Sequence, residues 1–281
     1  MVEAVRRALA EDLEPLGDLT ASLLDEGARG RLEIVAREAG VIAGQDLVVE
    51  TFAQIDPAVE VEVLVGDGGP VLAGDVVTRI GGPLAPILTA ERTALNFLGH
   101  LSGVASATAR VVAAVAAVSS DTRILDTRKT TPGLRALEKA AVRAGGGCNH
   151  RANLSDAVLI KDNHLGSIGI AEAVRRARAA WPGRNVEVEC EDLDQLREAA
   201  AAGAGSVLLD NMSPAEAAAA TTLARELAPG MLIEVSGRIT EESAAGFAAA
   251  GVDLISVGAI THSARTLDLG LDLAVDDGGR P

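Results

Sequence analysis

The chain has 281 residues, 48% of them hydrophobic, and a formal net charge of −15 at pH 7. This length suits one large domain or two unequal ones, and the apolar content is enough for a sizeable core. The negative charge argues against nonspecific binding to nucleic acid or to anionic membranes. Aromatic residues are scarce, three Phe and one Trp, which also argues against stacking of single-stranded nucleic acid.

Cysteine usage and the N-terminus indicate a cytoplasmic protein with no membrane partner. The two cysteines, Cys148 and Cys190, supply neither a disulfide framework nor the ligands of a zinc site. Residues 1–14 have the pattern of an amphipathic helix with acidic residues, which is unlike a signal peptide. The longest apolar run, 111–118, is far shorter than a membrane span.

The first hundred residues have the pattern of a small α+β domain. A helix is expected over residues 1–12, and the segments 31–38 and 59–65 alternate apolar and polar side chains as half-buried strands do. Glycine-rich turns separate these segments. We therefore place a first, α/β domain at residues 1–103.

The segment 87–118 has helical spacing that Gly99 and Gly103 interrupt, and it is predicted to bridge the first domain and a second at 104–281. The last residues of the chain are candidates for packing back on the first domain. Arg92 lies outside the apolar face of this helix, and a lone arginine there is as often simply solvated as functional.

From residue 123 onward the pattern changes to repeated βα units. Six short apolar runs end in polar residues or glycine, and a helical segment follows each of them. Their continuous apolar character indicates strands that are buried on both faces. The runs are 123–129, 157–164, 186–192, 206–212, 232–238 and 254–262.

Two architectures fit such repeats, an open doubly wound sheet and a barrel. An open sheet concentrates its chemistry at one switch point, whereas every strand of a barrel ends at the same mouth. Here all six runs end in polar residues or glycine, which favours a ring. Because a complete barrel of this kind has eight units, we expect an incomplete α/β barrel.

All three lysines of the chain lie in one segment, 126–164, which carries a net charge of +3 while the remainder carries −18. Lys161 ends a predicted strand, where an unpaired buried ammonium is costly, so it faces a ligand or pairs with Glu189 or Asp210. The cationic candidates for binding an anionic ligand are Arg128, Lys129, His150, Arg151 and Lys161.

Glu189 and Asp210 end consecutive predicted strands. Mg²⁺ in proteins commonly takes one or two carboxylates together with substrate phosphates, so this pair is a candidate magnesium site. The same carboxylates are also suited to balancing the lysines, and the two roles are compatible.

Two strand–turn–helix segments, 233–242 and 255–263, carry glycine at the turn. Backbone amides at helix N-termini bind phosphate, and the last loops of a barrel are a common place for such a site. His262, in the second segment, fits a binding or a structural role. The residues alone therefore predict a ligand with several anionic groups, at least one of them phosphate, bound beside magnesium.

Motifs along the whole chain resemble the quinolinate phosphoribosyltransferase family. They include GDLT (17–20), ERTALNFLGHLSG (91–103), DTRKTTPGLR (126–135), GGGCNHR (145–151), LIKDNH (159–164), LLDNMSP (208–214), IEVSG (233–237) and ISVGAITHS (255–263). The resemblance implies an enzyme of NAD biosynthesis that joins quinolinate to phosphoribosyl pyrophosphate. The products would be nicotinate mononucleotide, pyrophosphate and CO₂.

The resemblance also assigns roles to individual residues. Arg128, Lys129, His150, Arg151 and Lys161 would hold quinolinate and the anionic groups of the ribosyl donor, and Thr127 belongs to the same segment. Glu189 and Asp210 would face the ribose and the magnesium pyrophosphate, and with Lys129 and Lys161 they are the catalytic candidates. The loops expected to bind the donor's 5-phosphate contain Ser236, Gly237, Arg238, Val257, Gly258 and Ala259, with His262 close behind.

In the same family an arginine at the position of Arg92 reaches into the site of a neighbouring subunit. This likeness implies a homodimer or a higher even assembly such as a hexamer, and it favours a functional role for Arg92. The implied fold is an N-terminal α/β sandwich domain followed by an open barrel of about seven strands.

Arg238 departs from the family, which usually has glycine after the Ser-Gly pair. If the backbone amide at this position binds phosphate, a side chain is tolerated provided that φ is negative there. Under that condition the additional cation would strengthen binding rather than obstruct it.

Three other functions fit parts of the pattern. A related phosphoribosyltransferase would act on another pyridine or pyrimidine acid. A Schiff-base aldolase would use a strand-end lysine, although paired arginines and phosphate loops exceed what that chemistry needs. A non-catalytic sensor of phosphorylated metabolites is the third alternative.

Overall fold

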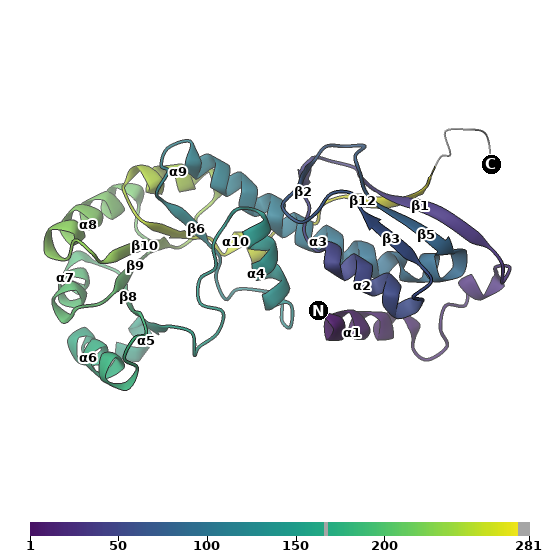
Figure 1. The fold of residues 1–281 in the computed structure, drawn as a ribbon. Coiled ribbons are helices and arrows are strands. Elements are labelled where there is room, and N and C mark those ends of the chain that lie inside the picture. Colours follow the sequence, from purple (N-terminus) through teal and green to yellow (C-terminus); the bar gives the residue numbers. More distant parts are fainter. Residues whose placement is uncertain (166–167, 275–281) are drawn as a thin grey trace. The chain divides into compact units, whose positions relative to one another are not determined.

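The computed structural model describes residues 1–165 and 168–274. The chain divides into two compact units, and each is built around its own sheet (Figure 1). Of the described residues, the first unit contains 1–107, 131–146 and 264–274, and the second contains 108–130, 147–165 and 168–263. The predicted domain boundary at residue 103 remains a prediction.

The first unit contains a four-stranded antiparallel sheet in the order β12-β1-β5-β3. Its strands are β1 (Arg29–Ala36), β3 (Glu60–Val63), β5 (Val76–Pro83) and β12 (Leu269–Leu273), and a separate pair consists of β2 (Gly40–Val41) and β4 (Pro70–Val71). Strand β12 pairs with β1 from Leu32–Leu273 to Ala36–Leu269. The last described strand is therefore part of the same sheet as the first.

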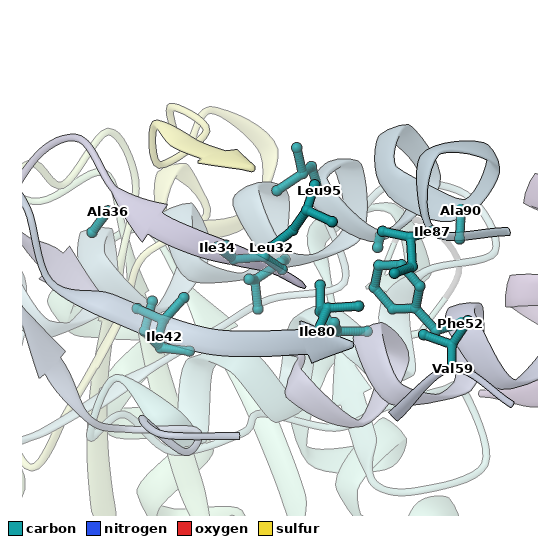
Figure 2. Close-up of a cluster of buried hydrophobic side chains, with 14 of the residues drawn as sticks. Leu32, Ile34, Ala36, Ile42, Phe52, Val59, Ile80, Ile87, Ala90 and Leu95 are labelled. Atoms are coloured by element: carbon teal, nitrogen blue, oxygen red, sulfur yellow. The ribbon is translucent and has the colours of Figure 1, made fainter. Parts of the chain in front are cut away.

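Helices α2 (Gln45–Ile55) and α3 (Leu84–Ala116) pack on this sheet through buried aliphatic and aromatic side chains. The first unit also contains α1 (Val2–Leu13), which packs against α2, the 3₁₀ turn η1 (Ala21–Leu23) and α4 (Arg135–Ala144), and only the first part of α3 belongs to it. Figure 2 shows Phe52 of α2 next to Ile87 of α3, with Ile80 of β5 in the same cluster. Burial of such side chains supplies the main stabilisation of a unit of this size.

Helix α3 is continuous, so the predicted interruption at Gly99 and Gly103 is wrong. A Cβ at Gly103 would lie 3.1 Å from Cα of Thr266, and one at Gly99 would lie 3.1 Å from the carbonyl oxygen of Leu267. The glycines therefore allow the segment before β12 to approach the helix closely. Helix α3 is long and apolar enough to cross a membrane, but 67% of its most apolar window is buried inside the fold, as in a core helix.

The second unit contains a six-stranded parallel sheet in the order β6-β11-β10-β9-β8-β7. Its strands are β6 (Arg123–Leu125), β7 (Val158–Ile160), β8 (Val186–Cys190), β9 (Ser206–Asp210), β10 (Leu232–Ser236) and β11 (Leu254–Ser256). All six predicted apolar runs thus form strands. The polar residues or glycines at the end of each run follow the last hydrogen-bonded residue of the strand and form the loop that leaves the sheet.

Helices cover the outer face of this sheet, as Figure 1 shows for α6 to α9. The helices are α5 (Asp162–Leu165), α6 (Ile170–Ala180), α7 (Leu193–Ala202), α8 (Pro214–Leu227), α9 (Glu241–Ala249) and α10 (Ala259–His262). Helix α8 begins with a capping box in which Ser213 and Glu216 satisfy each other's backbone N–H groups. Helices on one face leave the other face of the curved sheet to enclose a site.

The sheet is an open barrel, because β6 and β7 are its two end strands in the described part of the chain. The fold class implied by the resemblance is therefore correct, with six strands rather than seven. A parallel bridge between Leu125 and Cys148 adds a short further pairing beside β6. Cys148 lies within the GGGCNHR motif (145–151), so the bridge places this motif at an edge of the sheet.

Candidate active site

The parallel register of the second unit brings alternate side chains of neighbouring strands to the inner face of the barrel. Glu189 of β8 and Glu234 of β10 both pair with Leu208 of β9. Ser236 of β10 pairs with Asp210 of β9. Because side chains alternate along a strand, these residues form layers on one face, and they line a cavity of about 510 Å³.

Eleven of the predicted site residues line this cavity. They are Thr127, Arg128, Lys129, His150, Arg151, Lys161, Glu189, Asp210, Ser236, Gly237 and Arg238. The sequence therefore identified residues from the ends of β6, β7, β8, β9 and β10 that the fold brings together.

The second predicted phosphate loop stands apart from that lining. Val257 is buried and donates its backbone N–H to Leu125, while Thr261 Oγ1 donates to the carbonyl oxygen of Lys129 at 2.8 Å. A Cβ on Gly258 would lie 3.2 Å from Cδ of Lys129. Through Thr261 and Gly258 this loop lies against the backbone and stem of Lys129, and the predicted residues Val257, Gly258, Ala259 and His262 are not among those that line the cavity.

Arg92 is exposed on α3 and belongs to the first unit, so it is not one of the residues around this cavity. Its predicted role in another subunit stays a prediction. Asn96 is likewise exposed one helical turn further along α3.

Lys161 and Glu189 form a direct ion pair. The Glu189 side chain is only 11% exposed, whereas that of Lys161 is 41% exposed. The alternative that Lys161 pairs with an acid at a neighbouring strand end is therefore correct, and both partners also line the cavity. An anionic group that enters the cavity would therefore meet Lys161 already paired with Glu189.

Two residues with left-handed backbone meet at the ends of β9 and β10. Asn211 has φ of 56° and Arg238 has φ of 43°, and the N–H of Asn211 donates to the carbonyl oxygen of Ser236 at 2.9 Å. Asparagine tolerates this conformation, but arginine rarely adopts it. The condition of negative φ for Arg238 is therefore not met, and its side chain lines the cavity from a strained backbone.

His150 lies over two buried glutamates that the sequence analysis did not assign. Its Nε2 is 3.1 Å from Glu187 Oε2 and 3.4 Å from Glu234 Oε2. The relative exposures of Glu187 and Glu234 are 5% and 1%. A signal for them existed in the sequence, since each glutamate stands inside an apolar run and two residues before an assigned site residue, Glu189 or Ser236.

The surroundings of His150 favour a proton on Nε2. Burial lowers the pKa of this imidazole, but hydrogen bonds and charges from Glu187 and Glu234 outweigh burial and raise the pKa to about 10. The backbone N–H of Arg151 lies 2.7 Å from Nδ1 and needs its lone pair, so this contact opposes a second proton. In either state Nε2–H faces the two carboxylates.

Arg151 sits among cations as well as acids. Burial lowers the pKa of its guanidinium, and the charge of Arg128 lowers it further, while Glu187 acts in the opposite direction. A bound dianion would relieve the repulsion between the two arginines. The site is therefore suited electrostatically to an anionic ligand.

Glu189 and Asp210 offer oxygen ligands for a magnesium ion, but they do not form a complete cage. Asp210 Oδ2 accepts a hydrogen bond of 2.6 Å from Asn211, and Glu189 is paired with Lys161. Across the described residues, neither acid belongs to a cluster of three protein groups able to hold a metal ion. The pair fits magnesium that is bound mainly by the phosphates of a substrate.

An open α/β barrel whose strand ends surround a cavity with cations and carboxylates is typical of enzymes that act on small phosphorylated or carboxylated substrates. Family models make this class specific. The model of the quinolinate phosphoribosyl transferase N-terminal domain matches residues 18–102, and that of the C-terminal domain matches residues 104–272. The chain belongs to the quinolinate phosphoribosyl transferase family, so the predicted resemblance is confirmed.

Individual relatives are similar over nearly their whole length. The nicotinate-nucleotide pyrophosphorylase (carboxylating) of Mycobacterium leprae is 42% identical over 275 residues, which cover 96% of each chain. The structure of the nicotinate-nucleotide pyrophosphorylase from Francisella tularensis is 41% identical with a TM-score of 0.91, covering 97% of this chain and 95% of that one. The enzyme of the same name from Ehrlichia chaffeensis is 36% identical with a TM-score of 0.91, covering 97% and 98%.

Replacing Arg238 separates the effect of its backbone from that of its charge. We expect Arg238→Gly to change the free energy of unfolding by less than about 1 kcal/mol, because relief of left-handed strain and the greater freedom of glycine oppose each other. Affinity for phosphoribosyl pyrophosphate should be unchanged or weaker. Isothermal titration calorimetry measures that affinity, and Arg238→Asn is the control, because it tolerates the same φ without the charge. Clearly tighter binding by both variants would mean that Arg238 obstructs the loop.

Proposed function

We propose that this chain joins quinolinate to phosphoribosyl pyrophosphate and releases nicotinate mononucleotide, pyrophosphate and CO₂, a step of NAD biosynthesis. The observation that carries the proposal is the single cavity in which Arg128, Lys129, Arg151 and Lys161 face Glu189 and Asp210. Family membership over both units supports the same reaction. The aldolase and sensor alternatives gain no support from either source.

Quinolinate carries two carboxylates, which are costly to remove from water unless cations receive them. Arg128 and Arg151 are suited to bidentate binding of these groups, and Lys161 supplies a mobile point charge. Because Lys161 already contacts Glu189, the substrate's carboxylate would displace or share that ion pair. The pocket is thereby preorganised without leaving an isolated buried charge.

In the first chemical step the lone pair of the pyridine nitrogen forms a bond to the anomeric carbon of the ribosyl donor. The bond from that carbon to oxygen breaks, and its electron pair leaves with pyrophosphate. Glu189 and Asp210 are suited to stabilising the positive charge that develops on the ribose. Ser236 and Gly237 would hold the donor's phosphate at the end of β10, so that the anomeric carbon is positioned for attack.

In the second step the carbon–carbon bond to the carboxylate beside the ring nitrogen breaks. CO₂ leaves, and the electron pair remains on the ring carbon, next to the positively charged nitrogen. That carbon then takes a proton, for which Lys129 and Lys161 are both candidates. Both lysines line the same cavity, and the choice between them stays open.

We propose Mg²⁺ as the cofactor, held by Glu189 and Asp210 together with the donor's phosphates. When bound, it would neutralise the charge that accumulates on the departing pyrophosphate. The open arrangement of the two acids supports this sharing, since Mg²⁺ prefers few protein carboxylates and retains waters or phosphate oxygens.

We further propose a homodimer or a higher even assembly in which Arg92 is donated to the site of a neighbouring subunit. Its exposure on α3, in the unit that does not carry the cavity, supports this role. A cytoplasmic location fits the two free thiols, Cys148 and Cys190, which a reducing compartment maintains.

An assay with quinolinate, phosphoribosyl pyrophosphate and Mg²⁺ tests the proposal, with nicotinate as the competing acceptor. Product should form with quinolinate, and Lys161→Ala should reduce turnover by at least about tenfold, because the pocket loses a cation that meets substrate charge. Arg176→Ala, which removes an exposed cation of α6, is the matched control and should retain activity. Near-normal turnover by Lys161→Ala, or a preference for nicotinate, would contradict this assignment.

Mixing two inactive variants tests the donation of Arg92 across subunits. Arg92→Ala and Lys161→Ala should each be nearly inactive alone, because each removes a different half of a shared site. After subunit exchange, random dimers should recover up to about a quarter of the wild-type activity, since half of them contain one intact site. The measurement is turnover before and after exchange in mild denaturant. No recovery despite proven exchange would argue that Arg92 acts within its own chain.

A further inference from the structure

His150 bridges strands that are not neighbours in the sheet. Its Nε2 lies close to Glu187 of β8 and also to Glu234 of β10. In the sheet, β9 lies between these two strands. The His150 side chain is only 14% exposed. One ring N–H thus ties two strands together from inside the barrel.

Each of the two glutamates is held in place by a further hydroxyl. Ser256 Oγ, at the end of β11, donates to Glu234 Oε1 at 2.6 Å. Ser206 Oγ, at the start of β9, donates to Glu187 Oε1 at 3.2 Å. Both carboxylates are buried, so loss of their partners would leave unpaired polar groups inside the protein, which costs considerable free energy. The N–H of His150 and the carboxylates therefore fix one another.

The segment that contains His150 and Arg151 is anchored at both ends of the open sheet, by a backbone N–H at one end and by a side chain at the other. Beside β6, the N–H of His150 donates to Oδ1 of the fully buried Asp126 at 2.9 Å. Arg151 Nη1 donates to the carbonyl oxygen of Ala157, directly before β7, at 3.1 Å. Since β6 and β7 are the end strands, His150 and Arg151 span the open side of the barrel.

The ring of His150 also holds Arg151 directly. Its Nδ1 accepts the backbone N–H of Arg151 at 2.7 Å, so the orientation of the imidazole and that of the following peptide plane restrict each other. If Nε2 lost its two carboxylates, the ring could rotate and Arg151 would lose this acceptor. The guanidinium of Arg151 would then be placed less accurately in the cavity.

From this geometry we infer that Glu187 and Glu234 are positioning residues for the dicarboxylate substrate. Through His150 they hold Arg151 at the place where it meets a substrate carboxylate. This inference rests on the proposed function and deepens it. The two glutamates act on the part of the site that we assign to quinolinate. Ser236, Gly237 and Arg238 belong to the part that we assign to the ribosyl donor.

The inference predicts a selective kinetic effect. Glu187→Gln and Glu234→Gln should raise KM for quinolinate by about tenfold and KM for phosphoribosyl pyrophosphate by less than about threefold, as expected for weakening charge-assisted hydrogen bonds. Ser256→Ala, which removes one donor to Glu234, should raise KM for quinolinate by a smaller factor. Glu226→Gln, an exposed glutamate of α8, makes the same chemical change away from the site and should leave both constants unchanged.

We call the contacts of His150 Nε2 with Glu187 and Glu234 the clamp, and a measurement on the substrate-free protein tests it independently of the reaction. NMR of the protein with ¹⁵N-labelled histidine should show a slowly exchanging Nε2–H that His150→Gln removes. Glu187→Gln and Glu234→Gln should shift this signal or broaden it by exchange. If these variants do not fold, Ser256→Ala provides both readouts, and an unchanged Nε2–H together with unchanged KM for quinolinate would overturn the inference.

The outcomes separate this inference from the proposed function. In one outcome, the wild-type protein does not use quinolinate, but the glutamate variants change the Nε2–H signal. The proposed reaction is then wrong, the contacts of His150 are purely structural, and the role in substrate positioning is overturned. If wild type uses quinolinate but both substrates' KM values rise equally, the glutamates stabilise the fold generally. Unchanged KM for quinolinate in folded variants would also overturn their positioning role.

Discussion

Charge compensation inside one small cavity is the constraint on which the second unit depends. Lys161 pairs with Glu189, and the Nε2–H of His150 faces Glu187 and Glu234, so each of these largely buried carboxylates has a cation or an N–H group beside it. Ion pairs of this kind contribute little net stability, because desolvation offsets their attraction. Their value here lies in holding cations at fixed positions, ready for the carboxylates and phosphates of a ligand.

The open barrel makes this arrangement possible. A closed ring would pair β6 with β7, whereas here His150 and Arg151 occupy the open side and join the two edges through side-chain bonds. The loop that delivers these residues starts from the short bridge at Cys148. Functional side chains therefore take the place of strand pairing, so that the same contacts serve closure of the fold and formation of the pocket.

The sequence predicted the parallel sheet because burial on both faces demands continuous apolar runs, and it located the site because polar residues followed each run. Lys161 was found for a physical reason, since burying an unpaired ammonium at a strand end costs free energy and so requires a partner or a ligand. Glu187 and Glu234 were missed because the local pattern shows no partner for them, although each stands two residues before an assigned site residue. Their common partner, Nε2 of His150, lies far away in the sequence, and only the folded sheet brings it next to both carboxylates.

Other errors came from long-range packing. Glycines inside a helical pattern usually weaken a helix, but Gly99 and Gly103 are required by the segment around Thr266, more than 160 residues away. Arg238 has a φ of 43°, although most residue types favour a negative φ, and it follows Ser236 and Gly237, which contact Asn211 at the end of β9. Local propensity therefore gave way to tertiary constraint at both places.

The most direct test of the account is the stoichiometry of the reaction with quinolinate labelled with ¹³C in the carboxylate beside the ring nitrogen. We predict one labelled CO₂ for each nicotinate mononucleotide formed, with release depending strictly on phosphoribosyl pyrophosphate. Mononucleotide that keeps the label, or CO₂ released without the ribosyl donor, would contradict a site in which cations bind the dicarboxylate and bond formation at nitrogen precedes decarboxylation.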